Sequence, residues 1–325
     1  MFTLTFNTVN ESYNTLISAI LEEGKSISPR GIETLEISPL AVTITNPLDN
    51  IIYNNARKLN YGFMLGELAW ILQASDDMNH ICWYNKNWSN FSDDGQTLNG
   101  AYGKRIFAYG DKKINQFEEA FKLLKEDPES RQASIVLFDP ALDYAKTKDK
   151  PCTNLMRFSI RRNKLNMIVF MRSNDVMFGY PYDVFNFTSL QTIMAGYLGV
   201  RVGTYTHIVD SFHMYTNQID WCKDIMNEPI KNLENSPLDR PTTREDIQTF
   251  LNVEQTTRKL HDKIDLEHIE EMLDDIESPY WRGNAAFLAL YNYRKIKKDD
   301  EFLEQFHPYI NNELIEILPK YKALK

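Results

Sequence analysis

Hydrophobic and polar residues follow two different spacings along this chain. Strand-like alternation or β-branched runs occur at residues 1–6, 32–45, 133–138, 154–160, 165–172 and 202–213. Helical spacing occurs at residues 10–24, 61–73, 115–126 and 184–198. Strands and helices interspersed in this way predict an α+β fold. The run at residues 32–45 fits either a single strand or a hairpin.

Local signals sharpen the ends of several of these elements. The segment Arg162-Asn163-Lys164 separates two strand-like runs and predicts a tight turn. Gly199 is placed to end the apolar helix before it. Residues 75–100 are polar and rich in Asn, Asp and Trp, so they are expected to be mostly loop.

The chain changes character after about residue 235. Thr242 followed by Glu245 resembles a capping box, and several amphipathic helical stretches follow it. We therefore expect an α+β domain over residues 1–235 and a helical C-terminal extension over residues 236–325 that packs on it.

Composition narrows the class of protein. With 325 residues, 43% of them hydrophobic and 12% aromatic, the chain can bury a large core, which excludes intrinsic disorder. A net charge of −9 argues against a general nucleic-acid binder. No apolar run reaches the length of a membrane span, and the first 20 residues contain no Lys or Arg, unlike a signal peptide. Three cysteines do not form a disulfide framework. A reduced, cytoplasmic protein is expected.

Two residues stand out as candidates for chemistry. Cys152 lies at a turn entering a strand, among polar and basic residues that include Arg172. A nearby guanidinium would lower the thiol pKa and favour a nucleophilic thiolate, although a lone cysteine is more often a small buried hydrophobe. Glu67 is the single acid in an apolar helix. It is either a snorkelling glutamate or a buried carboxyl suited to moving protons.

Several other kinds of site find no support in the sequence. There is no CxxC pair, HExxH or EF-hand pattern, so no metal site is expected. A GxGxxG or P-loop pattern is missing as well, which counts against Rossmann and P-loop chemistry. The histidines form no recognisable triad with Cys152.

Five motifs together resemble the thymidylate synthase superfamily. They are GAYGK, DPESRQASIVLFDP, PCTN, MRSNDVMFGYPYDVFNFTSLQ and THIVDSFHMY, in the family's order and spacing. The resemblance covers roughly residues 25–225. Within the superfamily, Cys152-Thr153-Asn154 and MRSNDV are especially similar to bacteriophage deoxycytidylate hydroxymethylases. The resemblance implies a large mixed β-sheet flanked by helices, in a homodimer with shared active sites.

The resemblance also implies a role for individual residues. Cys152 matches the nucleophile that adds to C6 of a pyrimidine, and Glu67 matches the glutamate that organises water and moves protons. Tyr102 matches a tyrosine near the reaction centre. The implied nucleotide contacts are made by Arg30, Arg131, Arg172, Ser173, His213 and Tyr215, with Arg131 reaching the phosphate of the partner subunit. The implied folate contacts are made by Asp175, Gly179 and Trp83.

Asp183 departs from the family pattern in an informative way. Thymidylate synthases have an asparagine here, whose amide can accept from uracil N3–H and donate to O4. An ionised aspartate cannot donate to O4, but it can accept from the 4-amino group of cytosine. A buried mismatch of this kind costs a few kcal/mol. Asp183 therefore favours a cytosine nucleotide.

Other departures concern the phosphate, the folate and water. Gln132 replaces the second of two paired arginines, and Thr153 replaces a histidine that follows the cysteine. Trp83 and Trp88 flank Asn85 where a tryptophan covers the intermediate in thymidylate synthases, and the sequence ends without the apolar tail that closes over folate. A site that admits water would add hydroxide to the exocyclic methylene in place of hydride.

The sequence therefore predicts a folate-dependent dCMP 5-hydroxymethyltransferase that uses 5,10-methylenetetrahydrofolate as co-substrate. The alternatives are a thymidylate synthase-like methyltransferase on dUMP, a hydroxymethylase acting on CMP or dUMP, and a catalytically silent nucleotide-binding protein. Expected partners are a pyrimidine nucleoside monophosphate, folate and a second copy of the chain, with no nucleic acid or membrane. A phage-encoded enzyme acting in the host cytoplasm fits these expectations.

Overall fold

The computed structural model describes residues 2–231, 238, 240–259, 266–297, 306–311 and 314. One mixed sheet of eight strands forms its centre, in the order β1-β4-β8-β7-β6-β5, with β3 also paired to β8 and β2 paired to β3. The strands are β1 (Phe2–Phe6), β2 (Lys25–Ile27), β3 (Thr34–Ile37), β4 (Leu40–Ile44), β5 (Ser134–Val136), β6 (Thr153–Arg161), β7 (Lys164–Asp175) and β8 (Arg201–Tyr215).

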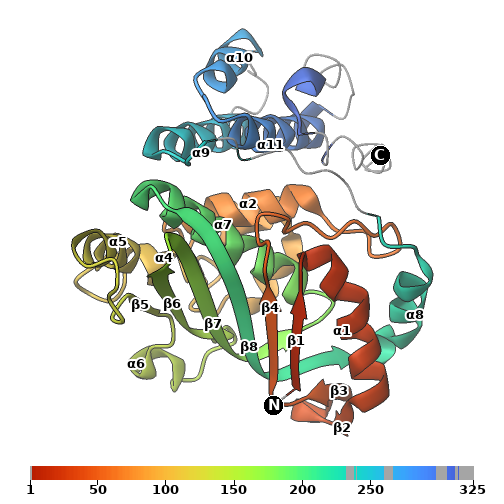
Figure 1. Ribbon diagram of the computed structural model, residues 1–325. Coiled ribbons are helices and arrows are strands. Elements are labelled where there is room, and N and C mark those ends of the chain that lie inside the picture. The colour runs from red at the N-terminus through yellow and green to blue at the C-terminus, as the bar shows by residue number, and fades with distance from the viewer. Residues whose placement is uncertain are drawn as a thin grey trace.

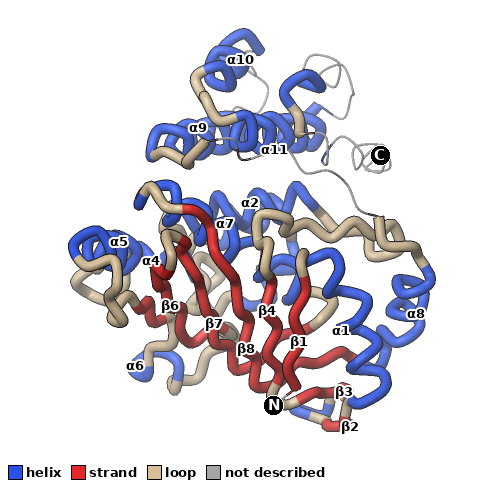
Figure 2. The backbone as a smooth tube through the Cα atoms, viewed as in Figure 1, coloured by secondary structure: helices blue, strands red, loops and turns tan. Residues whose placement is uncertain are grey.

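Helices surround this sheet on one face and at its edges (Figures 1 and 2). They are α1 (Val9–Glu23), α2 (Tyr61–Leu72), α3 (Met78–Tyr84), α4 (Tyr102–Phe107), α5 (Gln116–Glu126), α6 (Pro140–Asp143), α7 (Tyr180–Leu198) and α8 (Ile219–Asn227). The apolar helix α7 packs on β7 and β8, and α2 packs on α7. Residues on both sides of α2 are buried, which explains its nearly uniform hydrophobicity. The predicted α+β fold with a large mixed sheet and flanking helices is confirmed.

Two local expectations need correction. β3 and β4 do not form a hairpin, because both pair antiparallel with the long strand β8. The segment at residues 75–100 is not mostly loop, since it contains α3 and a 3₁₀ helix at Lys86–Phe91. The expected tight turn is present, with Arg162 and Asn163 both at positive φ (53° and 57°). The helix end at Gly199 is also present, with this glycine at φ 67°.

The sheet bends where β7 and β8 approach the site. Along β7 the buried positions are odd-numbered up to Met171, and the next buried position is Asn174. β8 shifts in the same way, from Val209 to Phe212. A one-residue shift turns the following side chains to the other face. The bend therefore turns the Asn174 side chain into the interior. Arg172 and Ser173, the two residues before it, both stay at least partly exposed.

The described part of the C-terminal extension, at the top of Figure 1, contains three further α-helices, α9 (Arg244–Lys259), α10 (Leu266–Asp274) and α11 (Pro279–Lys297), and a 3₁₀ helix at His307–Tyr309. α9 and α11 pack on α2. The predicted boundary near residue 235 lies outside the described residues. The cap of α9 is one residue later than predicted, because Thr243 and Asp246 bond to each other's backbone N–H. The hydroxyl of Thr242 instead accepts from Trp281 Nε1 at 2.9 Å.

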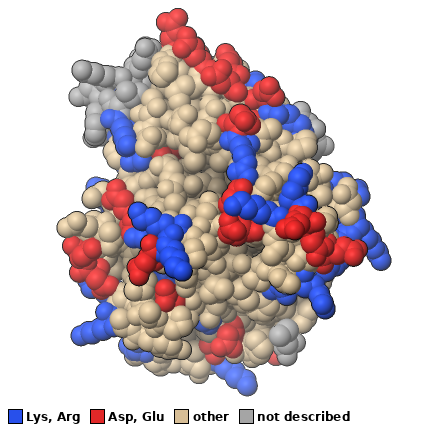
Figure 3. Space-filling view, turned by 90° about the vertical axis from the view of Figure 1, so that its left-hand side faces the viewer, with Lys and Arg blue, Asp and Glu red and all other residues tan. Residues whose placement is uncertain are grey.

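The described surface carries charges of both signs. In Figure 3, basic and acidic side chains are interspersed over the visible face. Among the described helices, none is both long and apolar enough to cross a lipid bilayer.

Candidate active site

Cys152 lies directly before β6, where the end of β7 holds it in place. The backbone N–H of Arg172 donates to the Cys152 carbonyl at 2.9 Å. The Arg172 guanidinium donates to the backbone carbonyls of Pro151 and Lys150, and its Nη2 lies 3.6 Å from the Cys152 sulfur. The predicted pairing of this thiol with a guanidinium is therefore present in the fold.

The net effect on the thiol differs from the sequence expectation. Burial raises the pKa of Cys152 above its ordinary value, and the positive charges of Arg172 and Arg30 offset only part of this rise. The nearby carboxyls of Asp183 and Asp149 act against ionisation as well. The thiol is thus mostly protonated in the free protein, and the expectation of a lowered thiol pKa is wrong for this state.

Two buried acidic side chains, Glu67 and Asp183, lie near each other, and Asp183 also lies near the cysteine. Glu67 on α2 is buried, with 9% of its surface exposed. Burial and the charge of Asp183 raise the Glu67 pKa to about 8, against one hydrogen bond from Asn186 Nδ2 at 2.8 Å. Burial likewise raises the pKa of Asp183, in the first turn of α7, to about 7. Near pH 7 both groups exchange protons readily, as acid–base chemistry requires.

Tyr102 connects the cysteine segment to α7. Its hydroxyl accepts from the backbone N–H of Thr153 at 3.3 Å, and its ring stacks on Phe187 with 5.9 Å between ring centroids. Burial, Asp183 and Cys152 together raise the Tyr102 pKa well above its ordinary value, so the phenol keeps its proton. Tyr102, Cys152 and Asp183 thus lie around one small volume.

The predicted sugar and folate residues gather at the ends of β7 and β8. Asp175 pairs across the sheet with His213. The rings of His213 and Tyr215 meet edge to face at 5.5 Å. The charges of Arg30, Cys152 and Asp175 all act on Tyr215.

The remaining predicted residues take different positions around this group. Ser173 pairs with Ser211 just before the strand ends. Arg131 is exposed near the outer edge of the sheet, where its carbonyl accepts from the Arg157 guanidinium. Gly179 caps α7 beside the site.

Trp83 lies against the C-terminal extension. Its indole Nε1 donates to Asn292 of α11 at 2.8 Å, and the Lys295 ammonium lies 5.0 Å from its ring centroid. Trp88 faces Phe63 and Trp70 of α2. The C-terminal extension therefore contacts Trp83 of α3 directly. The folate contact of Trp83 stays a prediction.

Sequence reasoning did not single out several side chains that the fold brings to this site. Asn186 bonds Glu67, and Asn174 donates to Asp183 at 2.7 Å. Phe178 is 55% exposed, and its backbone N–H donates to the predicted folate ligand Asp175 at 3.1 Å. The helical spacing of Asp183 and Asn186 could have indicated one shared face of α7. The contact of Asn174 depends on the bend in the sheet, which the alternation does not reveal.

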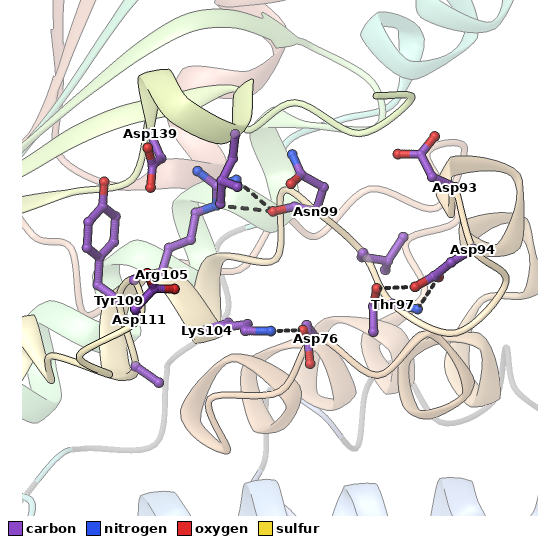
Figure 4. Close-up of a pocket in the computed structure, with 14 residues that line it drawn as sticks. Asp76, Asp93, Asp94, Thr97, Asn99, Lys104, Arg105, Tyr109, Asp111 and Asp139 are labelled. Atoms are coloured by element: carbon purple, nitrogen blue, oxygen red, sulfur yellow. Dashed lines mark hydrogen bonds and ion pairs between the residues drawn. The ribbon is translucent and has the colours of Figure 1, made fainter. Parts of the chain in front are cut away.

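A separate cavity of about 430 Å³ lies beside α4 and contains none of these residues (Figure 4). Five aspartates line it: Asp76, Asp93, Asp94, Asp111 and Asp139. Its two cations are already engaged, Lys104 with Asp76 and Arg105 with Asp143. The cavity is therefore acidic and poorly suited to a phosphate, unlike the surroundings of Cys152.

Comparison with known proteins agrees with this geometry. The thymidylate synthase family model matches residues 11–269. The chain belongs to the thymidylate synthase family, whose fold the eight-stranded sheet represents. The match continues past residue 235 into α10.

Individual relatives narrow the class further. A deoxyuridylate hydroxymethyltransferase of Bacillus phage SP01 is 30% identical over 94% of this chain and 83% of its own length. Another, of Delftia phage PhiW-14, is 31% identical over 56% of this chain and 54% of its own length. A thymidylate synthase of Bacillus licheniformis is 27% identical over 65% of this chain and 81% of its own length. The chain is a folate-dependent C5 hydroxymethyl- or methyltransferase of a pyrimidine nucleotide, with methylenetetrahydrofolate as co-substrate.

Proposed function

We propose that this protein is a dCMP 5-hydroxymethyltransferase. It would convert dCMP, 5,10-methylenetetrahydrofolate and water into 5-hydroxymethyl-dCMP and tetrahydrofolate. The observation that carries the cytosine assignment is the Asp183 carboxyl, which lies beside Glu67, Tyr102 and Cys152. In its ionised form it accepts from a 4-amino group and repels a 4-oxo group.

The assignment of a hydroxymethyl product rests on room for water. Within the described residues, the buried atoms Thr153 Oγ1 and Asn186 Oδ1 have no hydrogen-bond partner in the protein. Buried polar atoms of this kind are usually satisfied by an ordered water. Thr153 follows the nucleophile, and Asn186 contacts Glu67. The phage relatives named as hydroxymethyltransferases support the same product.

The proposed reaction follows from these positions. The Cys152 thiolate adds to C6 of the base, which makes C5 nucleophilic, and C5 attacks the methylene carbon carried by the folate. Glu67, acting through water, takes the C5 proton, and tetrahydrofolate leaves. Water near Glu67 then adds to the exocyclic methylene, and Cys152 is expelled from C6. Arg172 and Arg30 would hold the phosphate beside the thiol.

A second candidate substrate is dUMP. The relatives of Bacillus phage SP01, Delftia phage PhiW-14 and Pseudomonas phage M6 are named deoxyuridylate hydroxymethyltransferases. The test is incubation with dCMP, dUMP or CMP and methylenetetrahydrofolate, followed by mass spectrometry. We expect hydroxymethylated dCMP as the main product. A methylated product, which differs by one oxygen and is accompanied by dihydrofolate, would contradict the hydroxymethyl assignment.

The homodimer is part of the proposal. No helix covers the near face of β6, β7 and β8 in Figure 1. On one face of these strands lie half-exposed apolar side chains, among them Leu155, Ile168 and Phe170. Such a face suits a second copy of the chain. Arg157 also projects from β6 and holds the Arg131 carbonyl, so Arg131 borders this face and would reach the partner's phosphate site.

The proposal also covers the sugar of the substrate and the place where the enzyme acts. His213 and Tyr215, at the end of β8, would hold the sugar 3′-hydroxyl. We expect dCMP to be used better than CMP, because Ser173 and Arg131 match residues that thymidylate synthases use beside a deoxynucleotide. A kcat/KM for CMP equal to that for dCMP would contradict this. Action of a phage-encoded enzyme in the host cytoplasm fits the phage relatives.

A further inference from the structure

A chain of four side chains leads from the body of the sheet to Asp183. Tyr205 OH lies 2.7 Å from His207 Nδ1, and His207 Nε2 lies 3.1 Å from Asn174 Oδ1. Asn174 Nδ2 then donates to Asp183 Oδ2 at 2.7 Å. Tyr205 and His207 are fully buried, and Asn174 is 3% exposed. Asp183 is therefore not an isolated carboxyl, because its Oδ2 accepts a hydrogen bond from this buried series of side chains.

Tyr205 and His207, the two side chains of this series farthest from Asp183, are neutral. Burial lowers the pKa of His207 to about 3, so one ring nitrogen carries a proton and the other accepts. Burial also raises the pKa of Tyr205 well above its ordinary value. The hydroxyl of Tyr205 and the ring N–H of His207 both have an acceptor when Tyr205 donates to Nδ1 and Nε2–H donates to the Asn174 side-chain carbonyl. The amide of Asn174 then turns its N–H toward Asp183.

The Asn174 amide lies close to the first residue before α7. A Cβ atom added to Gly179 would lie 2.6 Å from Asn174 Nδ2, so a larger residue at this position would press on the amide. This close approach gives a physical reason for a glycine at the cap of α7.

The groups that face Asp183 come from two helices, two strands and the segment before β6. They are Glu67 on α2, Cys152 before β6, Tyr102 on α4, Asn174 on β7 and Tyr205 on β8. No Lys, Arg or protonated His occurs among them. The hydrogen bond from Asn174 is accordingly the stabilising contact of the ionised carboxylate, opposed by burial.

We propose that Asn174 is a positioning residue that sets which base the enzyme prefers. Oriented by His207, Asn174 donates to Oδ2 of Asp183 and so keeps this oxygen as an acceptor. Any proton on the Asp183 carboxyl therefore sits on Oδ1, which is the oxygen left to face the base. This inference rests on the proposed function, in which Asp183 reads the base. When ionised, Oδ1 accepts from the 4-amino group of cytosine. When protonated, it donates to O4 of uracil. One enzyme therefore accepts either base, and pH sets the preference.

The experiment measures dissociation constants of dCMP and dUMP by calorimetry, and kcat/KM for both, between pH 6 and 9. We expect the dCMP preference over dUMP to rise by about tenfold per pH unit, because one form of Asp183 serves each base. Asn174→Ala removes the donor to the carboxylate. At pH 7.5 it should lower the dCMP preference by about tenfold or more. Asn174→Ser, which keeps a donor, should recover part of it.

The matched control is Asn50→Ala. Asn50 is also buried and donates to Thr188 Oγ1 at 2.9 Å. Its loss should lower stability similarly and leave the base preference unchanged. A wild-type preference that is flat across pH, or an Asn174→Ala preference equal to that of wild type, overturns the inference. These outcomes differ from failure of the proposed function, in which neither nucleotide gives a hydroxymethylated product even though both affinities can be measured.

Discussion

Two buried glutamates on neighbouring parts of this molecule behave in opposite ways. Glu254 of α9 is fully buried, and Gln73, His80, Tyr84 and Arg258 surround its carboxylate. Although burial alone would raise its pKa, the hydrogen bond from His80 and the charge of Arg258 hold it near 2. Among the described residues, Asn186 donates a hydrogen bond to Glu67 and Asp183 is a second carboxyl nearby, and burial together with Asp183 raises the pKa of Glu67 to about 8.

The difference separates a structural carboxylate from a reactive one. Glu254 joins α9 to α2 and α3 and has its acceptor capacity used within the protein, which fixes its charge. The carboxyl of Glu67 accepts fewer hydrogen bonds from the described residues and lies near Asp183, so substrate or water can complete its surroundings. We therefore expect substitutions at Glu67 and its neighbours to change activity, and a substitution at Glu254 to change stability.

The largest expected effect is at the nucleophile. Cys152→Ser should reduce turnover roughly a thousandfold or more, because a hydroxyl is a far weaker nucleophile than a thiolate. Nucleotide affinity should change little. Steady-state kinetics and calorimetry on the pure variant measure both. Cys82→Ser, at a cysteine of α3, should keep wild-type activity. Substantial turnover by Cys152→Ser would remove this residue from the mechanism.

Asp183→Asn should change base choice by about two orders of magnitude. The amide can donate to O4 of uracil, so the variant should gain activity on dUMP and lose activity on dCMP. The ratio of kcat/KM values at saturating folate measures the change. A ratio that stays at the wild-type value would show that Asp183 does not read the base.

Exchanging each glutamate for glutamine contrasts the two regions directly. Glu254→Gln should lower the free energy of unfolding at pH 7 by about 3 kcal/mol, since it leaves buried donors without a carboxylate, and kcat should stay within about twofold. Glu67→Gln should abolish most activity while keeping the fold. Urea denaturation and steady-state kinetics measure both variants. Glu119→Gln, at an exposed surface pair, serves as a control.

The pH dependence of stability should differ in sign between the two sites. The folded pKa of Glu67 lies above its ordinary value of 4.5, so its contribution to stability is complete below that value and is lost as the pH rises through 8. Relative to Glu67→Gln, the wild type should lose on the order of 3 kcal/mol between pH 5 and 9. The contribution of Glu254 is present above pH 4.5 and is lost as the pH falls toward 2. Parallel pH profiles for wild type and both variants would contradict the assignment.

The smallest expected effect is complementation between subunits. An equal mixture of Arg131→Ala and Cys152→Ser chains should recover about a quarter of wild-type activity, because half of the dimers are mixed and each has one intact site. Activity after mixing and refolding measures this, with each variant alone as the control. Mixed dimers that form and stay inactive would refute a shared site.

Much of the site could be predicted because its residues are marked locally. Cys152, Arg172, Ser173 and Asp175 lie in motifs at strand ends, and Glu67 is the single acid of an apolar helix, so type and spacing identify them. The net pKa of Cys152 could not be predicted in the same way. It depends on burial and on Asp183 of α7, both of which only the fold decides, and on Asp149, three residues before the cysteine.

The sequence by itself determined the α+β class, the helix and turn signals at Gly199 and Arg162-Asn163, and the family to which the chain belongs, because these depend on local spacing and ordered motifs. Only the tertiary structure decided that β3 and β4 both pair with β8, that Asn174 turns inward to reach Asp183, and that α9 and α11 cover α2. Such features arise from contacts between residues far apart in the chain. A shift of one residue in the buried positions of β7 and β8 does not show in the hydrophobic pattern of the sequence, yet it decides that Asn174 meets the Asp183 carboxyl.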